Sequence, residues 1–401
     1  MPLGTICIFM TDPKKFLVQH FGPACLAGIT CFDWMALLTE NGFRVSPQYW
    51  GKAAFLSVSS LGTSTCRLIE EAMYAKRLSA HRPQAPVFIL GSWRSGTTYL
   101  HNILSLDDRF VSPNLFQTMY PHSCLMSEAW LRPLLDVFTP KKRFMDNMDM
   151  GLREPAEDEM ALAILSQRSN MLSWAFPQNA ARYDRFLDFR DVPDCDRQLW
   201  VQHLDRFVRK VTLRNAKLPL LKSPNHTARI RMILKLYPEA KFIHLRRNPD
   251  DVYRSLVHMA SQVIPVWGLQ TYSMETISDM VIDMYRRLYE AYFEQMPLIP
   301  AGQFHEIAYE ELVREPIPVL EETYRSLRLG DFELIRSVFE YYTSTKAGYQ
   351  KNQHREISES VSKQLRLQWQ QSYEAWDYPT RGASTVPADE RPFDTLRPLL
   401  G

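Results

Sequence analysis

Short, uninterrupted apolar runs mark the predicted strands of this chain. Val87–Leu90 is such a run and stops at a glycine, Leu218–Leu221 precedes a lysine, and Lys241–Leu245 follows a predicted helix over 227–236. Runs of this length without polar alternation are typical of strands buried on both faces of a parallel sheet. Residues 97–106 continue as a helix after the first run. The alternation predicts a three-layer α/β fold, with a central parallel sheet flanked by helices.

The rest of the chain divides into three regions. Residues 1–83 read as a mostly helical N-terminal extension, and a linker bounded by prolines follows it. We expect the main α/β domain over residues 84–378. Residues 379–401 form a proline-rich C-terminal tail, a composition typical of a segment that wraps the surface or is loosely ordered.

One segment of the extension, Ala53–Cys66, carries no charged residue and follows Tyr49 and Trp50. It fits a buried helix, and it also fits a helix lying at a membrane surface with the two aromatic residues at headgroup level. The second interpretation places a peripheral membrane contact at residues 49–66. No uncharged apolar run in the chain reaches the ~18–20 residues that a membrane-spanning helix needs.

Composition and charge narrow the class of protein. The chain has 401 residues, of which 45% are hydrophobic, and 47 Lys and Arg nearly balance 45 Asp and Glu. These values exclude a disordered chain and provide no broad basic field for nucleic acid, so any anion site must be a local cluster. The six cysteines include no CxxC pair. Reduced thiols are therefore expected, and with them a reducing, cytoplasmic compartment.

A glycine-bounded loop follows the first predicted strand. Its sequence, GSWRSGTT over residues 91–98, has the P-loop spacing of two glycines before a helix that begins with threonines. Such a loop turns backbone N–H groups toward an anion, and the helix N-terminus adds a partial positive charge. Thr97 stands where the nucleotide-binding lysine of a P-loop belongs, so ATP or GTP hydrolysis is not expected. Arg94 supplies a cation within the loop instead.

A second candidate anion site follows the third predicted strand. Arg247 lies at the carboxyl end of this strand, and Ser255 lies eight residues later on the next helix. An arginine offers a bidentate fork to a phosphate and a serine adds a hydroxyl donor. Arg246 is the alternative for the arginine role. The cluster could instead pair with Asp250 and Asp251 at the start of a solvated helix.

These two segments resemble the sulfotransferases that use 3′-phosphoadenosine 5′-phosphosulfate (PAPS). The sequence PVFILGSWRSGTTYLHNIL is similar to their 5′-phosphosulfate loop, and RRNPDDVYRS is similar to their 3′-phosphate motif. The resemblance implies a P-loop-like fold in which the 5′-phosphosulfate is held by Arg94, Ser95, Gly96, Thr97 and Thr98. It also implies that the 3′-phosphate is held by Arg247 and Ser255.

The resemblance extends over most of the chain, to the large bacterial-type branch with the widespread sulfotransferase domain. Its further marks include REPAEDEMAL, LKSPNHTARIR and the C-terminal YQKN, in which Lys351 would contact PAPS. It places 84–378 as the sulfotransferase domain. Lys222, at the end of a predicted strand, would touch the transferring group.

The reaction implied is in-line transfer of a sulfuryl group from PAPS to a hydroxyl, with no metal required. We assign Lys222 to stabilisation of the leaving group. Three candidates for the general base remain open: Glu157, Glu159 and His226. The acidic pair could equally serve a helix start, and His226 could be a helix-start residue with a backbone partner. His101 on the helix after the loop is more often structural in such a place.

The acceptor is expected to be a small hydrophobic or lipid-like alcohol, with no nucleic-acid partner. Bulky side chains are frequent in the middle segment and indicate either an ordinary helical core or an apolar pocket beside the sulfate: Phe116, Met119, Tyr120, Met126, Trp130, Phe144, Met145, Met148, Met171, Trp174 and Phe176. Two other functions stay open. One is a kinase-like nucleotide-binding protein without the P-loop lysine, and the other is a non-catalytic nucleotide-binding relative.

Overall fold

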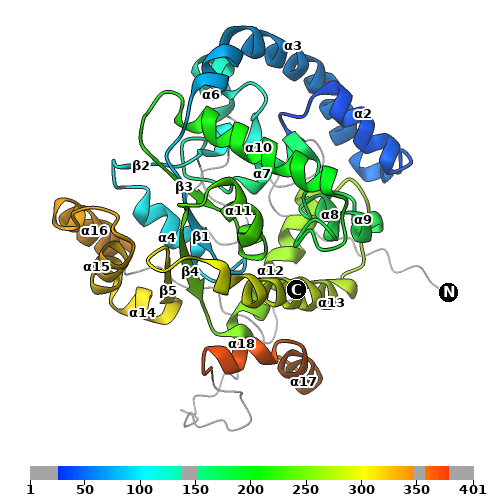
Figure 1. Cartoon of the computed structure of the whole chain (residues 1–401). Coiled ribbons are helices and arrows are strands. Elements are labelled where there is room, and N and C mark those ends of the chain that lie inside the picture. The colour runs from blue at the N-terminus through cyan, green and yellow to red at the C-terminus, as the bar shows by residue number, and fades with distance from the viewer. Residues whose placement is uncertain (1–25, 138, 140–150, 347–356, 379–401) are drawn as a thin grey trace, which may run out of the picture.

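A central sheet of five parallel strands organises the protein. The computed structural model describes residues 26–137, 139, 151–346 and 357–378 (Figure 1). The strand order is β2-β3-β1-β4-β5. The strands are β1 (Val87–Leu90), β2 (Phe110–Val111), β3 (Leu218–Lys222), β4 (Lys241–Arg246) and β5 (Phe304–Ala308). Helices cover the sheet, so the predicted three-layer α/β fold is confirmed.

Alternate residues of each strand enter two different hydrophobic cores. Val87 and Ile89 of β1 pack in one core, together with side chains of α4 (Thr97–Leu104), α14 (Tyr309–Arg314), α15 (Pro316–Leu327) and α16 (Glu333–Lys346). Phe88 and Leu90 enter the other core, which includes side chains of α10 (Asp194–Thr212), α11 (Ile230–Leu236), α12 (Pro249–Trp267) and α13 (Thr276–Gln295). Because successive strand residues point to opposite faces, a fully apolar strand is buried on both sides.

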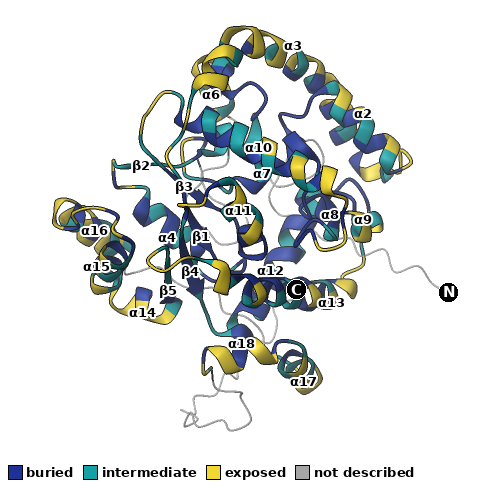
Figure 2. Ribbon diagram, in the orientation of Figure 1, coloured by how far each residue is buried: buried dark blue, intermediate teal, exposed yellow. Residues whose placement is uncertain are grey.

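The N-terminal helices share the second of these cores. Helix α2 (Cys31–Glu40) begins at Thr30, whose hydroxyl accepts from the Asp33 N–H, and buries Trp34. Helix α3 (Trp50–Ala80) is 31 residues long and crosses the top of the molecule in Figure 1. Its Lys52 donates to the Val266 and Gly268 carbonyls at the end of α12. In Figure 2 the side of α3 turned away from the body is exposed over most of its length.

Short helices fill the connection between β2 and β3. They are α5 (Leu115–Met119), α6 (Cys124–Asp136), α7 (Glu159–Ser166), α8 (Leu172–Ala175) and α9 (Ala180–Asp184), followed by α10. After β5, helices α17 (Glu359–Gln368) and α18 (Gln370–Ala375) close the described chain. The four cysteines that lie in the described ranges are free thiols: Cys31, Cys66, Cys124 and Cys195.

The structure differs from the predicted elements in two places. The helix predicted over 227–236 is divided into a 3₁₀ helix, η4 (Pro224–Ala228), and α11, because Arg229 leaves helical geometry at φ −127°. The Ser223 hydroxyl accepts from the Asn225 N–H and starts the 3₁₀ turn directly after β3. Strands β2 and β5 were not expected from the apolar pattern, and both lie at the edges of the sheet.

Candidate active site

The loop at residues 91–98 connects β1 to α4, as the spacing predicts. Gly91 and Gly96 have φ values of 138° and 101°, which side chains rarely adopt. A Cβ atom on Gly91 would lie 2.6 Å from the Leu245 carbonyl oxygen, and one on Gly96 would lie 2.4 Å from the Tyr309 ring. The loop thus needs glycine at both ends. Its last residues begin α4, and the first N–H groups of a helix have no intrahelical partners and can bind an anion.

Arg94 joins this loop to the second candidate anion site. Its Nε donates to the Ser255 hydroxyl at 2.8 Å, and its backbone carbonyl accepts from a terminal nitrogen of Arg247 at 2.8 Å. Ser255 is buried on α12, and Arg247 follows β4. The structure therefore brings together the two segments that the sequence separates by about 150 positions, and places them on neighbouring strands of the sheet.

The two adjacent arginines after β4 have different surroundings. The Arg247 guanidinium lies 4.4 Å from the centre of the Tyr309 ring, and its Nε is buried with no hydrogen-bond partner in the described structure. Arg246 instead lies 3.6 Å from a Glu306 carboxylate oxygen and over the Tyr378 ring. An unsatisfied buried donor is costly. The Arg247 side chain thus keeps one donor that no described group uses, while one of its terminal nitrogens lies 4.0 Å from an Asp251 carboxylate oxygen.

Beside the loop, Lys222 and Glu157 form a close ion pair. Lys222 ends β3 and lies in register with Ile89 of β1. Its Nζ atom is 2.6 Å from a Glu157 carboxylate oxygen and 3.4 Å from the Thr98 hydroxyl on α4. The side chain of Lys222 is only 3% exposed, whereas that of Glu157 is 22% exposed. A cation and an accessible carboxylate therefore lie together at the end of the 91–98 loop.

The other two candidates for the general base have other partners. Glu159 receives two hydrogen bonds from Arg229, at 2.7 and 3.1 Å, and a third from the Ser169 hydroxyl. His226 Nε2 lies 2.6 Å from Asp158, and both side chains are fully buried. These contacts lie in the core between α7 and η4. They engage both groups in the interior of the protein.

Two buried titratable groups near the Lys222–Glu157 pair, His101 and Asp158, have shifted pKa values. Burial, reinforced by the charge of Lys222, lowers the pKa of His101 to about 3, so this imidazole is neutral at physiological pH. Burial by itself would raise the pKa of Asp158, but the contact with His226 outweighs it and holds that pKa below its usual value. The result is an ionised Asp158 behind the pair and a neutral His101 on α4.

The sequence alone does not predict the role of two tyrosines at this site. Tyr309 packs against Gly96 and under Arg247, and Tyr289 accepts from the Ser92 N–H at 3.1 Å. The sequence around Tyr309 fits the family pattern, but the pattern does not say what the ring contacts. Lys351, expected to touch PAPS, lies outside the described residues.

The bulky side chains of the middle segment differ in how far they are buried. Phe116, Met171, Trp174 and Phe176 are buried, and Trp130 is 54% exposed. Phe144, Met145 and Met148 lie outside the described residues. Trp174 lines a cavity of about 240 Å³ between α8, α9, α12 and α13, together with Asn170, whose amide oxygen accepts from Asn225 in η4. Among the described residues, no three His, Cys, Asp or Glu side chains are grouped so that they could hold a metal ion.

Comparison with known proteins identifies the family. A sequence model described as the sulfotransferase family matches residues 86–333, which include the loop, Lys222 and Arg247. The chain belongs to the sulfotransferase family. It is therefore a transferase, and the kinase-like alternative is not supported. The family pattern predicted from the two anion-binding segments is confirmed.

Relatives with known names support the same family. The sulfotransferase is 34% identical over 322 residues to the omega-hydroxy-beta-dihydromenaquinone-9 sulfotransferase Stf3 of Mycobacterium bovis and to the protein of the same name in Mycobacterium tuberculosis. This alignment covers 80% of the chain and 83% of each relative.

Solved structures have the same fold at lower identity. Sulfotransferase STF9 from Mycobacterium avium superposes with a TM-score of 0.65 at 18% identity, covering 94% of this chain and 99% of that one. Sulfotransferase STF1 from Mycobacterium tuberculosis gives a TM-score of 0.60 at 16% identity, covering 84% of this chain and 91% of that one. The P-loop-like arrangement of sheet and helices is thus shared with sulfotransferases.

Proposed function

We propose that this sulfotransferase transfers the sulfuryl group of PAPS to the hydroxyl of a hydrophobic, lipid-like alcohol. The observation that carries the proposal is the contact of Arg94 with Ser255 and Arg247, because it joins two anion-binding segments beside the Lys222–Glu157 pair. A donor with anionic groups at both its 5′ and 3′ positions fits such a double site. The buried, unpartnered Nε of Arg247 supports the 3′-phosphate assignment.

Different residues of the chain bind the donor, stabilise the leaving group and accept the proton. When bound, PAPS supplies an electrophilic sulfuryl group for in-line attack. Arg94 and the N–H groups of the loop hold the 5′ anion, and the Lys222 ammonium stabilises negative charge on the leaving oxygen. Glu157 accepts the proton of the attacking hydroxyl, since it is the accessible carboxylate at Lys222. The core partners of Glu159 and His226 favour Glu157 over both.

The acceptor class rests on the relatives and on the helices beside the site. The similar Stf3 proteins are named for a hydroxylated dihydromenaquinone, a lipid with a terminal hydroxyl. In this chain, Trp174, Met280 and Met284 line one part of a cavity whose lining also includes the charged Asp184, Asp283 and Arg287. Asn170 lines it too and accepts a hydrogen bond from Asn225, three positions after Lys222. We propose that the apolar part of the acceptor lies on this side of the site.

Two measurements test the function. Adenosine 3′,5′-bisphosphate should raise the melting temperature in the presence of EDTA, because a ligand at 100 times its Kd stabilises the folded state by about 2.7 kcal/mol. ATP at the same concentration should give no comparable rise. Labelled PAPS offered with a panel of prenyl alcohols, hydroxylated quinols and simple phenols should then yield a sulfated prenyl or quinol product. Equal stabilisation by ATP, or no sulfated product from any alcohol, would refute the proposal.

A further inference from the structure

The outward side of α3 is apolar and carries no charge over most of its length. Successive helix residues are about 100° apart, so positions spaced three, four or seven apart share a face. The exposed apolar residues of α3 follow this spacing and lie opposite its buried residues Leu56, Ser60 and Thr63. We call these residues the apolar face of α3: Trp50, Phe55, Val58, Leu61, Leu68, Ile69 and Met73. Val58 and Leu68 are 72% and 71% exposed.

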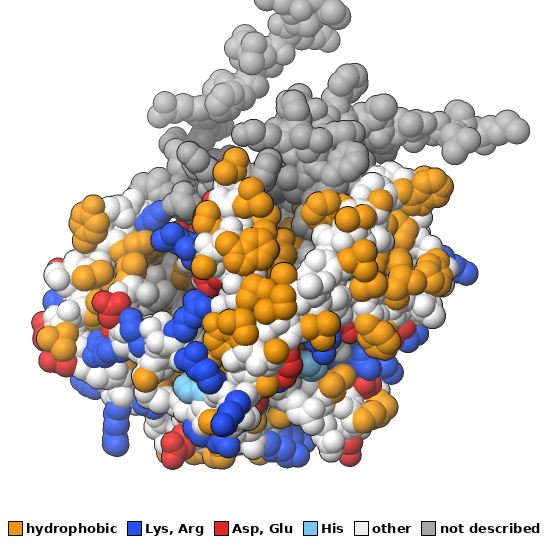
Figure 3. Space-filling model, turned by 90° about the horizontal axis from the view of Figure 1, so that it is seen from above, with side chains coloured by type: hydrophobic (Ala, Val, Ile, Leu, Met, Phe, Trp, Pro, Cys, Tyr) orange, Lys and Arg blue, Asp and Glu red, His pale blue; other side chains and the backbone are white. Residues whose placement is uncertain are grey.

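Helix α2 extends this apolar surface. It packs along α3, where Trp34 Nε1 donates to the Ser57 hydroxyl at 2.9 Å. Its own exposed apolar residues are Phe32 and Met35, and Phe43 follows in the next turn. Figure 3, which looks down on this side, shows hydrophobic side chains gathered in broad bands. Exposed apolar side chains gathered into one patch are typical of an interaction surface.

Exposed cations lie at the two ends of the apolar face. Arg44 precedes α3, and Lys76 follows Ile69 by seven positions, so it lies on the same face; neither forms an ion pair with an acidic side chain of the described structure. Arg67 lies seven positions after the buried Ser60, on the side of α3 that lines the cavity toward α10. Glu71, in contrast, is paired with Arg206. An apolar face that has Trp50 at its start and the exposed cations Arg44 and Lys76 near its two ends matches the acyl and headgroup layers of an anionic bilayer.

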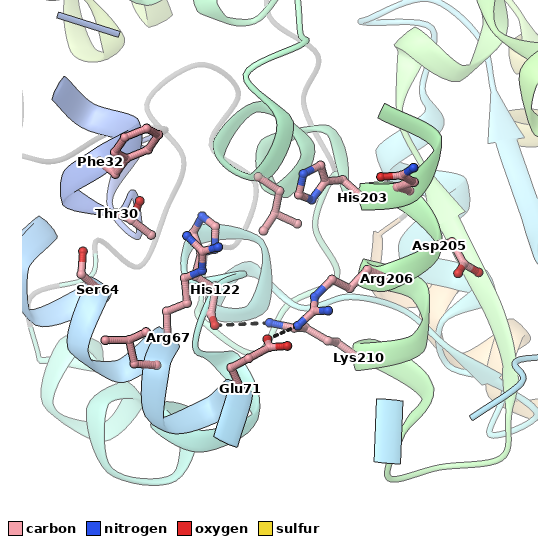
Figure 4. A pocket seen from close by; sticks show the side chains of 13 residues that line it. Thr30, Phe32, Ser64, Arg67, Glu71, His122, His203, Asp205, Arg206 and Lys210 are labelled. Carbon is pink, nitrogen blue, oxygen red and sulfur yellow. Dashed lines mark hydrogen bonds and ion pairs between the residues drawn. The ribbon is translucent and has the colours of Figure 1, made fainter. Parts of the chain in front are cut away.

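The apolar face also borders a cavity. This cavity of about 840 Å³ lies between α2, α3 and α10, and its lining includes Phe32 of α2 and Leu68 and Arg67 of α3 (Figure 4). In the close-up, Arg206 and Lys210 from α10 approach it from the opposite side. Within the cavity Arg206 pairs with Glu71 and Lys210 pairs with Glu70, whereas Arg67 has no ion pair in the described structure and lies next to Leu68 at the apolar rim.

We propose that α2 and α3 dock this sulfotransferase on the surface of a membrane that contains anionic lipid. The helices lie in the plane of the interface, since no described helix has the length and apolarity to cross a bilayer. This proposal rests on the proposed lipid-like acceptor, because docking would let the enzyme take its substrate from the membrane. A peripheral contact at residues 49–66 is thereby extended to α2 and to the whole outward side of α3.

Vesicle co-sedimentation of the full chain tests the proposal. Wild-type protein should sediment with vesicles of phosphatidylcholine that contain phosphatidylglycerol, and less with pure phosphatidylcholine. A double variant, Val58→Asp with Leu61→Asp, should bind at least roughly tenfold more weakly, because two carboxylates would enter the apolar layer and oppose anionic lipid. The matched control, Leu334→Asp with Leu367→Asp, changes two leucines that are each 76% exposed on α16 and α17, and should bind as wild type.

Other outcomes separate the alternatives. Wild-type protein that stays in the supernatant with both vesicles, or a Val58→Asp, Leu61→Asp variant that binds like wild type, overturns the proposal. Light scattering that shows a dimer, dissociated by the same variant and without vesicle binding, overturns it in favour of an interface between two copies. Turnover of a water-soluble short-chain alcohol should be equal in all variants. Vesicle binding without any turnover would count against the proposed function and leave the docking surface standing.

Discussion

The Nε atom of Arg94 donates a hydrogen bond to the Ser255 hydroxyl at 2.8 Å, although the two residues are 161 positions apart in the chain. One residue lies in the loop after β1, and the other on the helix after β4. Parallel strands put their carboxyl ends at one edge of the sheet, so segments that follow neighbouring strands meet there. This contact joins the 91–98 loop to the helix after β4, the two segments that we propose bind the donor.

Glu157→Gln should slow turnover by about 10²–10⁴-fold, because the amide cannot accept the proton of the attacking hydroxyl. The affinity for adenosine 3′,5′-bisphosphate should be nearly unchanged. Steady-state kinetics and calorimetric titration measure the two effects. Glu154→Gln is the control, as Glu154 is an exposed carboxylate three residues earlier. Full turnover in the Glu157 variant would move the base elsewhere.

Lys222→Met should lower kcat by roughly 10²–10³-fold, because one donor of charge stabilisation is lost from the transition state. The Glu157 carboxylate loses its closest partner in the same variant. Lys217→Met provides the comparison, since Lys217 precedes the same strand but pairs with Asp108 at the surface. A kcat within twofold of wild type in the Lys222 variant would contradict the assigned role.

Arg247→Ala should weaken binding of adenosine 3′,5′-bisphosphate by about 10–100-fold, as expected for loss of a hydrogen bond to a charged group. Binding of adenosine 5′-phosphate, which lacks the 3′-phosphate, should change much less. Isothermal titration of both ligands against both proteins isolates the contribution of that phosphate. Equal losses for the two nucleotides would mean that Arg247 does not contact it.

Glu159→Ala should destabilise the protein by about 3–5 kcal/mol, because it leaves the buried Arg229 guanidinium without its carboxylate. Denaturant unfolding measures the loss of free energy. Glu154→Ala, at an exposed position, should have little effect. Turnover per folded molecule should be retained in Glu159→Ala. A folded variant without turnover would instead return Glu159 to the list of candidate bases.

The pH dependence of stability should include a contribution from His101. Burial, and then Lys222, lowers its pKa from 6.5 to about 3. As the pH falls, the unfolded chain therefore protonates at His101 before the folded protein does. The free energy of unfolding is highest above pH 6.5 as far as this group is concerned, and it falls as the pH is lowered from 6.5 to 3. His101→Asn should reduce the slope of unfolding free energy in that range by about 1.4 kcal/mol per pH unit. Unfolding curves at several pH values would show this, and an unchanged slope would contradict it.

The sheet was predictable where its strands are buried on both faces. Strands β1, β3 and β4 are short apolar runs in the sequence, and their ends were placed within a residue or two. Strand β5, by contrast, is only partly buried and contains His305 and Glu306, so no apolar run marks it. An edge strand exposes part of its surface and tolerates polar residues. Strand β2 has only two residues and is too short for any pattern to show.

The choice among neighbouring acidic residues could not be made from sequence. Glu157, Asp158 and Glu159 are consecutive at the start of α7, yet they pair with Lys222, His226 and Arg229 in turn. Successive positions at a helix start point in different directions, and only the packing decides what each meets. The motif located the acids near the loop, whereas the fold determined which one is accessible.

In the strand order β3-β1-β4, the loop after β1 lies between the segments that follow β3 and β4. Arg247 and Ser255 come from the β4 side, and Lys222 comes from the β3 side, where η4 leads to Asn170 and the short helices. If the proposed function holds, the helices on the β3 side can change during evolution to contact another acceptor, while the residues on the β4 side continue to bind the nucleotide. Such a fold would allow the enzyme to accept a different alcohol without a change in the residues proposed to bind the sulfuryl donor.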